Sequence, residues 1–367
     1  MASGEFSPEH IFVERSVQDL PFTRGLLDRW PEIRPHMVRN PQQAVESLAG
    51  QPDPIGAGKR SVLIARQRGP FIKRCPGTKN YICCGYRIIN VATNCNLDCT
   101  YCILQSYLTI PFLVVYANVE DLITQLDGFL SSGLDDFYRL GTGELTDSLS
   151  LDPIFGHAKL LVPYFADKTG AILELKTKTT NVEDLLRLEH GQRTVVSWSL
   201  NAESIARQEE NGAPPIDERL QAARRCHEAG YRIGFHFDPL IEYPGWEEDY
   251  RQVVDGIFDY VAPEAIAWIS LGALRYPPKL DEIIRHRHPQ SEVVLGELLP
   301  GKDGKLRYFK PIRIEMFRQL NAWIKKHDPD LFVYLCMESD QVWRQAMGWS
   351  PSNMATLSRL LDERVRP

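Results

Sequence analysis

The sequence lacks a long apolar run: no stretch of roughly 18 or more consecutive apolar residues occurs, and the N-terminus has no signal-peptide pattern. We therefore expect no association with a membrane and a cytoplasmic location. The chain has no low-complexity tract and no repeat of short fixed period. It also lacks an excess of positive charge, since its formal net charge is −6 at pH 7. No global field attracts nucleic acid, so nucleic-acid binding would need local basic patches.

The composition is that of an ordinary folded protein. The 367 residues are 43% hydrophobic and 25% charged, which suits one large domain or one domain with appendages. Eight cysteines are present. In a cytoplasmic chain of this size they indicate metal or redox chemistry rather than a disulfide framework.

Three of the cysteines stand close together, in the pattern C-x3-C-x2-C. Cys95, Cys99 and Cys102 follow a short apolar strand expected over 86–92. Three thiolates on one loop can bind three irons of a [4Fe–4S] cluster and leave the fourth iron open, and no fourth cysteine follows within reach of the loop. The alternatives are a zinc site, which usually takes four ligands, or unrelated buried thiols.

The remainder of the chain reads as alternating strands and helices. After a proline-rich segment and a strand at 61–66, strands are expected at 86–92, 136–140, 171–178, 193–201, 232–238 and 265–271. Helices are expected between them at 119–131, 154–167, 182–189, 217–229 and 246–260.

Six consecutive βα-type units predict an α/β fold, a partial (β/α)6 TIM-type barrel. We expect an irregular N-terminal extension at 1–58, the barrel at 59–280 and a C-terminal α/β appendage at 281–367. Functional side chains should collect at the carboxyl ends of the strands.

The cysteine motif, with Tyr101 before its last cysteine, resembles that of the radical S-adenosylmethionine superfamily. The resemblance implies that the open iron binds S-adenosylmethionine. One electron from the reduced cluster would then cleave the cofactor to methionine and a 5′-deoxyadenosyl radical, which abstracts hydrogen from a substrate. An external one-electron donor of the flavodoxin or ferredoxin type is implied as well.

A narrower resemblance, to the spore photoproduct lyase family, covers roughly residues 60–315. It rests on Cys102-Ile-Leu-Gln, Thr177-Lys178, Ser199-Leu-Asn201, Arg219-Leu-Gln-Ala-Ala-Arg-Arg and Ala229-Gly-Tyr-Arg-Ile-Gly-Phe. That family reverses a thymine–thymine photolesion in DNA. The resemblance makes cofactor contacts of the following residues, all of which also suit ordinary structural roles: Tyr101, Gly143, Glu144, Lys178, Ser199, Asn201 and His236. Tyr101, within the cysteine motif, is a candidate catalytic residue as well.

Two departures from the family concern how its radical is quenched. The resemblance places the family's hydrogen-donor cysteine at Gly141 and a relay tyrosine at Ile103. Neither residue offers a readily donated hydrogen. Cys84, in the group Cys75, Cys83 and Cys84, is a candidate replacement donor; these cysteines also suit a second metal site or apolar packing.

Substrate contacts are expected from Arg275 and from a basic hairpin at 302–310. In the lyase family a hairpin of this region wedges into the lesion, and Arg307 and Tyr308 would play that part. A solvated basic loop is the alternative. The expected substrate is a DNA thymine lesion or a nucleoside. The competing functions are a radical enzyme with a substrate other than nucleic acid and a DNA-binding relative without repair activity.

Overall fold

The computed structural model describes residues 6–77, 80–133 and 137–366. Its main element is an eight-stranded sheet with the strand order β18-β14-β13-β11-β10-β9-β5-β4. All neighbours in this sheet are parallel except the antiparallel pair β4 and β5. The strands are β4 (Ile72–Arg74), β5 (Arg87–Ile89), β9 (Tyr138–Gly141), β10 (Ala171–Thr177), β11 (Thr194–Ser199), β13 (Arg232–Leu240), β14 (Ile266–Ala273) and β18 (Val333–Leu335).

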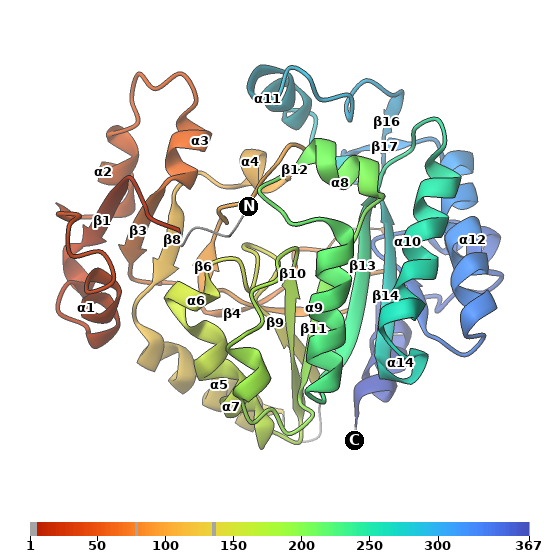
Figure 1. Cartoon of the computed structure of the whole chain (residues 1–367), viewed down its shortest axis with the longest axis horizontal. Helices are drawn as coiled ribbons and strands as arrows, with labels where there is room; N and C mark the ends of the chain where they lie inside the picture. The colour runs from red at the N-terminus through yellow and green to blue at the C-terminus, as the bar shows by residue number, and fades with distance from the viewer. Residues whose placement is uncertain (1–5, 78–79, 134–136, 367) are drawn as a thin grey trace.

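Six of these strands correspond to the six predicted βα units. Helices α5 (Val119–Ser132), α7 (His157–Ala166), α9 (Ile216–Glu228) and α10 (Trp246–Tyr260) connect them and pack on the outside of the curled sheet (Figure 1). Shorter helices α4 (Leu104–Tyr107), α6 (Asp152–Phe155) and α8 (Glu203–Glu209) lie in the same connections. The partial barrel predicted from the sequence is confirmed.

The helix predicted at 182–189 is wrong. Only a 3-10 turn, Leu185–Arg187, forms there. The connection must also make the turn into β11, in which the Arg193 amide donates to the His190 carbonyl at 2.8 Å, and this leaves no room for a longer helix. The predicted strand at 136–140 begins at Tyr138, and its first residue, Asp136, lies outside the described residues.

The N-terminal residues are more regular than expected. They supply β1 (His10–Glu14) and β2 (His36–Val38) to a second sheet, ordered β2-β1-β3-β8-β6, whose other strands are β3 (Ser61–Ala65), β8 (Leu113–Tyr116) and β6 (Ala92–Thr93). The prolines that suggested irregular chain instead begin helices, as proline's fixed φ allows. Pro21, Pro41 and Pro54 open α1 (Pro21–Leu27), α2 (Pro41–Glu46) and α3 (Pro54–Lys59).

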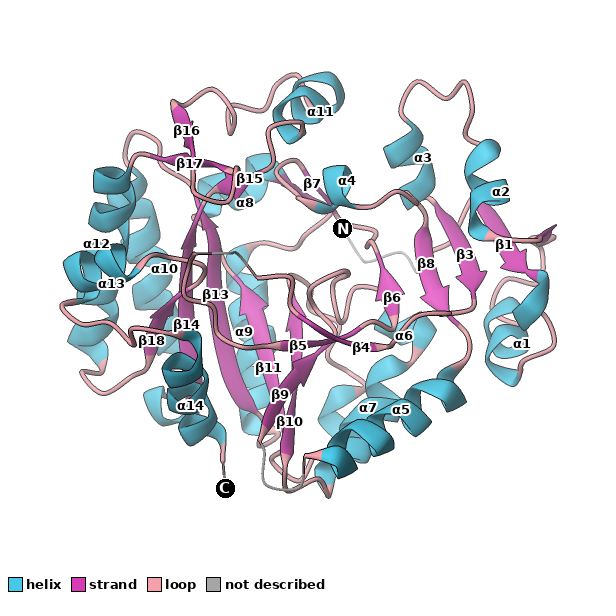
Figure 2. Ribbon diagram, turned by 180° about the vertical axis from the view of Figure 1, so that it is seen from behind, coloured by secondary structure: helices cyan, strands magenta, loops and turns pink. Residues whose placement is uncertain are grey.

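The C-terminal region adds to the barrel rather than forming a separate unit. Its strand β18 pairs with β14 as the last strand of the main sheet. The predicted hairpin is present as β16 (Leu298–Pro300) and β17 (Leu306–Tyr308), and β15 (Arg275–Tyr276) pairs with it (Figure 2). The helices of this region are α11 (Leu280–Arg287), α12 (Lys310–His327), α13 (Asp340–Met347) and α14 (Met354–Val365).

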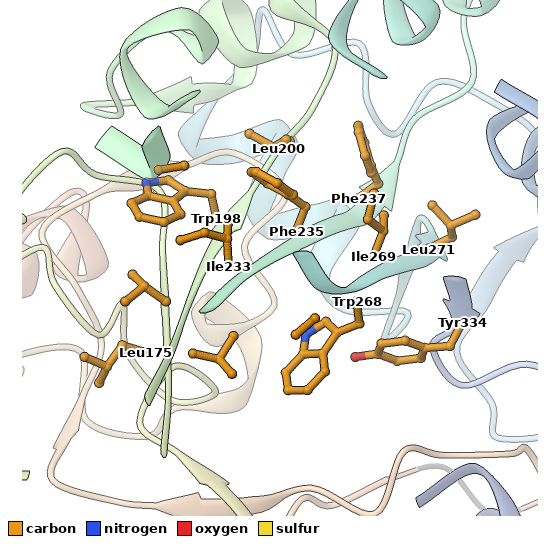
Figure 3. Close-up of a cluster of buried hydrophobic side chains, with 14 of the residues drawn as sticks. Leu175, Trp198, Leu200, Ile233, Phe235, Phe237, Trp268, Ile269, Leu271 and Tyr334 are labelled. Atoms are coloured by element: carbon orange, nitrogen blue, oxygen red, sulfur yellow. The ribbon is translucent and has the colours of Figure 1, made fainter. Parts of the chain in front are cut away.

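The barrel strands carry different side chains on their two faces, because successive residues of a strand point to opposite sides. One face is apolar and forms the core against the helices; Trp198, Phe235 and Leu271 belong to it (Figure 3). The alternate residues are largely polar, and the in-register pairs Lys176 with Ser197 and Ser199 with His236 place them on the same face. Polar groups therefore gather on the inner face of the sheet.

Candidate active site

The three motif cysteines lie in the loop that leaves the first barrel strand. Cys95 and Cys99 are buried and Cys102 is half-buried. The loop forms a two-residue strand, β7 (Asp98–Cys99), which pairs antiparallel with β12 (Glu210–Asn211). Burial raises the pKa of the Cys99 thiol, Lys178 opposes the rise, and Cys102 and Cys95 are close enough to raise it further. The three thiols therefore share one region.

These residues fit a [4Fe–4S] cluster in kind and number. Among the described residues, no group of three or more His, Cys, Asp or Glu side chains converges closely enough to hold a single metal ion. A cube-shaped cluster has a different requirement, since each thiolate binds a different iron and the ligands are spread apart. Three free thiols on one largely buried loop meet it, whereas the arrangement does not suit the tetrahedral zinc alternative.

Two buried cations hold the cysteine loop in place. Lys59 of α3 donates to the Asn94 side chain at 3.1 Å and to the carbonyl oxygens of Cys95 and Leu97 at 3.0 and 2.6 Å. Arg287 of α11 pairs with Asp98 of the same loop at 3.0 Å. The N-terminal residues and the C-terminal region thus both position the ligand loop.

A buried carboxylate, Glu210, lies behind the loop and connects three predicted residues. The Tyr101 hydroxyl donates to it, Lys178 Nζ lies 3.3 Å away, and Arg219 Nη2 lies 2.6 Å away in an ion pair without good hydrogen-bond geometry. Burial alone would raise the pKa of Glu210, but the charges of Lys178 and Arg219 hold it at about 2. Glu210 therefore links Tyr101 and Lys178, and the Lys178–Glu210 ion pair lies near Cys99.

The loop after β9 carries Gly143 and Glu144. A Cβ at Gly143 would lie 2.6 Å from the Cβ of Lys176, so this close approach of strand and loop requires glycine. Glu144 is half-buried, and Lys176 Nζ lies 3.3 Å from its carboxylate. The loop touches the cysteine loop directly, since the Asn94 amide donates to the Leu145 carbonyl at 2.7 Å. Glu144 thus stands next to the cysteine loop, where its predicted role requires it.

Asp147 fixes this loop to the end of β10. Its carboxylate accepts from the amides of Leu149 and Ser150 at 2.9 Å, from Thr177 Oγ1 at 2.7 Å and from the Lys178 amide at 2.7 Å. A single side chain therefore sets the relative position of Glu144 and Lys178.

Ser199 and Asn201 follow at the end of β11. Asn201 uses both ends of its amide within the protein: it donates to Tyr101 Oη at 3.4 Å and to the Pro239 carbonyl at 3.2 Å, and it accepts from the Ala202 amide and from Tyr250. Its side chain orients Tyr101. The Ser199 carbonyl accepts from Arg219 at 3.0 Å, and its cofactor contact stays a prediction.

His236 meets Glu174 on the inner face of the sheet. Its Nε2 lies 2.8 Å from the Glu174 carboxylate and its Nδ1 lies 2.6 Å from Ser270 Oγ, so both ring nitrogens are engaged. Burial would raise the pKa of Glu174, but His236 and Ser197 stabilise its charge and hold the pKa at about 2. Strand β11 separates these two residues, which meet because the sheet is curled.

Arg275 and Cys84 are two further predicted site residues. Arg275 binds Asp238 through two contacts of 2.9 Å, and its Nη2 lies 3.5 Å from Cys336 Sγ. Burial raises the pKa of the Cys84 thiol, Arg139 lowers it, and Glu144 and Glu174 raise it. The role of Cys84 as a hydrogen donor stays a prediction.

The hairpin forms, but it does not present the predicted wedge. Arg307 is only 2% exposed: it lies 2.7 Å from Asp303 and 4.3 Å from the centre of the Tyr81 ring. Tyr308 is 4% exposed, and its hydroxyl accepts from the Glu242 amide at 3.2 Å. These partners hold both side chains inward in this structure, and their contact with a duplex stays a prediction. The neighbouring Phe309 is 43% exposed instead.

This placement gives Arg307 a structural role that can be measured. We expect Arg307→Met to lower the free energy of unfolding by about 2 kcal/mol, because Asp303 loses a buried charged partner. Phe309→Ala should change it by less than ~0.5 kcal/mol, as for other surface substitutions. Denaturant unfolding of both variants tests the assignment. Equal stability of Arg307→Met and the parent would restore the wedge as the reason for this arginine.

Several residues of the site were missed by sequence reasoning. Glu174 and Lys176 alternate in an otherwise apolar strand, and this period-two pattern was the available signal that they share a face. Lys59 and Glu210 gave no such signal. Each acts on a segment far away in the sequence, and isolated charges in loops or at helix ends are usually solvated.

A family model described as spore photoproduct lyase matches residues 6–330. The Bacillus subtilis (strain 168) spore photoproduct lyase is 25% identical over 300 residues, 80% of this chain and 85% of that protein. The Geobacillus sp. (strain Y412MC61) enzyme is 26% identical over 212 residues, 57% of this chain and 62% of that protein.

A solved spore photoproduct lyase variant with bound AdoMet and dinucleoside spore photoproduct has the same fold, with a TM-score of 0.81. It is 21% identical, and the match covers 92% of this chain and 100% of that one. None of the described helices is long and apolar enough to span a membrane.

Proposed function

The chain belongs to the spore photoproduct lyase family, and from this we propose that it is a radical S-adenosylmethionine enzyme acting on a thymine lesion in DNA or on a nucleoside. One observation carries the proposal. The three-thiol loop, Glu144 and the Lys178–Glu210 pair meet at the carboxyl ends of neighbouring parallel strands. This is the edge where βα barrels place their reactive groups.

Cys95, Cys99 and Cys102 would hold the [4Fe–4S] cluster, and Glu144 would accept hydrogen bonds from the amino group of S-adenosylmethionine. When bound and reduced, the cluster and cofactor would supply the radical chemistry that removes a hydrogen atom from the substrate. The protein's own part is to position and shield. Lys59 fixes the loop carbonyls, and burial of the loop limits access of water to the thiolates.

The contacts proposed for Lys178 and His236 follow from their charge and their position. Lys178 Nζ lies 5.8 Å from the centre of the Tyr101 ring. We propose that this ammonium group pairs with both Glu210 and the cofactor carboxylate. His236 can offer its ring face, since both nitrogens are occupied. An electron donor of the flavodoxin or ferredoxin class completes the proposal.

The test is anaerobic reconstitution with iron and sulfide, followed by reduction in the presence of S-adenosylmethionine. We expect 5′-deoxyadenosine to form, and thymidine to be released when dinucleoside spore photoproduct is added. Samples without reductant are the control. Absence of 5′-deoxyadenosine would contradict radical chemistry and favour a DNA-binding relative. Formation of 5′-deoxyadenosine without thymidine release would move the substrate outside the thymine lesions.

A further inference from the structure

Tyr86 carries a buried hydroxyl whose role in the fold is not evident. The residue is 6% exposed, and Tyr86 Oη has no hydrogen-bond partner among the residues that the structure describes. Leaving a buried polar group unsatisfied typically costs about 1–3 kcal/mol. A phenylalanine would avoid this cost, so the hydroxyl calls for an explanation other than stability.

The hydroxyl lies at the end of β9, against Gly141. A Cβ built on Gly141 would fall 1.9 Å from Tyr86 Oη and 2.3 Å from the Glu174 carbonyl oxygen. The phenol therefore fills the space that a side chain at position 141 would need. Tyr86 immediately precedes β5, and β5 pairs with β9 so that Ile88 is opposite Gly141. The Tyr86 side chain therefore extends alongside β5 until its hydroxyl lies next to Gly141.

The surroundings of Tyr86 Oη are those of the site itself. Burial raises the pKa of the phenol, and the charges of Glu174 and Glu144 raise it further. Glu174 lies on the inner face of the sheet, and Glu144 lies in the loop after β9. The phenol is therefore held in its protonated form beside the strand end that carries the proposed cofactor ligand.

We propose that Tyr86 is the hydrogen-atom donor that quenches the substrate radical in this protein. The inference rests on the proposed function. Phenolic O–H and thiol S–H bonds are the readily donated ones among side chains, and the described residues of β9 and its loop include no thiol. An O–H that is not engaged in a hydrogen bond has no partner to lose when its hydrogen moves.

The O–H bond of Tyr86 breaks homolytically, a C–H bond forms on the substrate-derived carbon radical, and a neutral phenoxyl radical remains on Tyr86. One electron from the flavodoxin- or ferredoxin-class donor that also reduces the cluster, together with one proton from solvent, restores the phenol. No atom of Tyr86 other than this hydrogen is exchanged.

The decisive variant is Tyr86→Phe in the reconstituted enzyme with dinucleoside spore photoproduct. We expect 5′-deoxyadenosine formation within about twofold of the parent and at least a tenfold loss of thymidine release. After exchange into D2O, the parent should place one deuterium in the product and Tyr86→Phe none. Two matched controls share the interior, namely Tyr334→Phe, which removes another buried phenol, and Cys84→Ser, which removes the competing thiol donor.

Two further measurements do not depend on turnover of a variant. The apoprotein of Tyr86→Phe should unfold at the parent's temperature or above, which a structural role for the hydroxyl would not allow. Freeze-quenched parent enzyme should show a phenoxyl radical signal that narrows when its tyrosines are ring-deuterated.

The proposal is overturned if Tyr86→Phe releases thymidine like the parent, or if Cys84→Ser alone shows the tenfold loss. It is also overturned if the parent's product carries no solvent deuterium. Failure of the proposed function looks different: the parent itself would form no 5′-deoxyadenosine or release no thymidine.

Discussion

Replacing Cys99 by serine should leave the reconstituted protein without iron–sulfur absorption in the visible range and without 5′-deoxyadenosine formation above the enzyme-free background. The three thiols of the loop are the proposed protein ligands, and a serine hydroxyl is a much poorer ligand for iron than a thiolate. With two thiolates left, the cluster has too few anchors on the loop. Iron content, visible absorption and 5′-deoxyadenosine yield measure the loss.

The fold should survive this change, which makes the result interpretable. The backbone of Cys99 is held by the pairing of β7 with β12, and serine is close to cysteine in size. The free energy of unfolding of the apoprotein should therefore fall by no more than about 1–3 kcal/mol, the cost of burying a hydroxyl. Cys226→Ser is the matched control: this thiol is buried on α9 among core residues, and its variant should keep about four irons per chain and full activity. Equal iron loss in both variants would contradict the assignment of the ligands.

The sequence was most informative about features that depend on residues close together in the chain. The order of barrel strands follows from short apolar segments with helices between them, and the cysteine spacing indicates the proposed ligand set. Prolines led to the prediction of an irregular segment at 1–58, because proline both breaks chains and opens helices, and at Pro21 and Pro54 the second role applies. Short-range patterns do not distinguish the two.

The inner face of the barrel was less predictable, because its contacts join distant parts of the chain. Glu174 reaches His236 across a strand, and Lys59 reaches a loop that follows it by more than thirty residues. The burial of the predicted wedge residues was not anticipated for the same reason. Arg307 looked like an exposed basic residue in sequence, but Asp303 and Tyr81 bury it. A charged side chain is buried only where the fold places an opposite charge or another partner beside it. The sequence alone does not show which distant residues come into contact.

Glu210 provides the second large effect. We expect Glu210→Gln to lower the free energy of unfolding of the apoprotein at pH 7 by about 3–5 kcal/mol, since Lys178 and Arg219 would lose their buried counter-ion. Glu183→Gln is the matched control. Glu183 makes a comparably close contact of 2.6 Å with Arg225, but its side chain is 73% exposed, and such a surface pair contributes less than ~1 kcal/mol.

The effect of Glu210→Gln should depend on pH in a defined direction. The pKa of Glu210 is lowered from 4.5 to about 2 by folding, so its carboxylate contributes stability that is fully present above pH 4.5 and is lost as the pH falls through about 2. A shift of this size corresponds to about 3 kcal/mol. Glutamine resembles the protonated acid, so the difference between parent and variant should close as the pH falls from about 5 to 2. Denaturant unfolding at several pH values measures it. A difference that stays constant over this range would show that Glu210 acts through its shape and not through its charge.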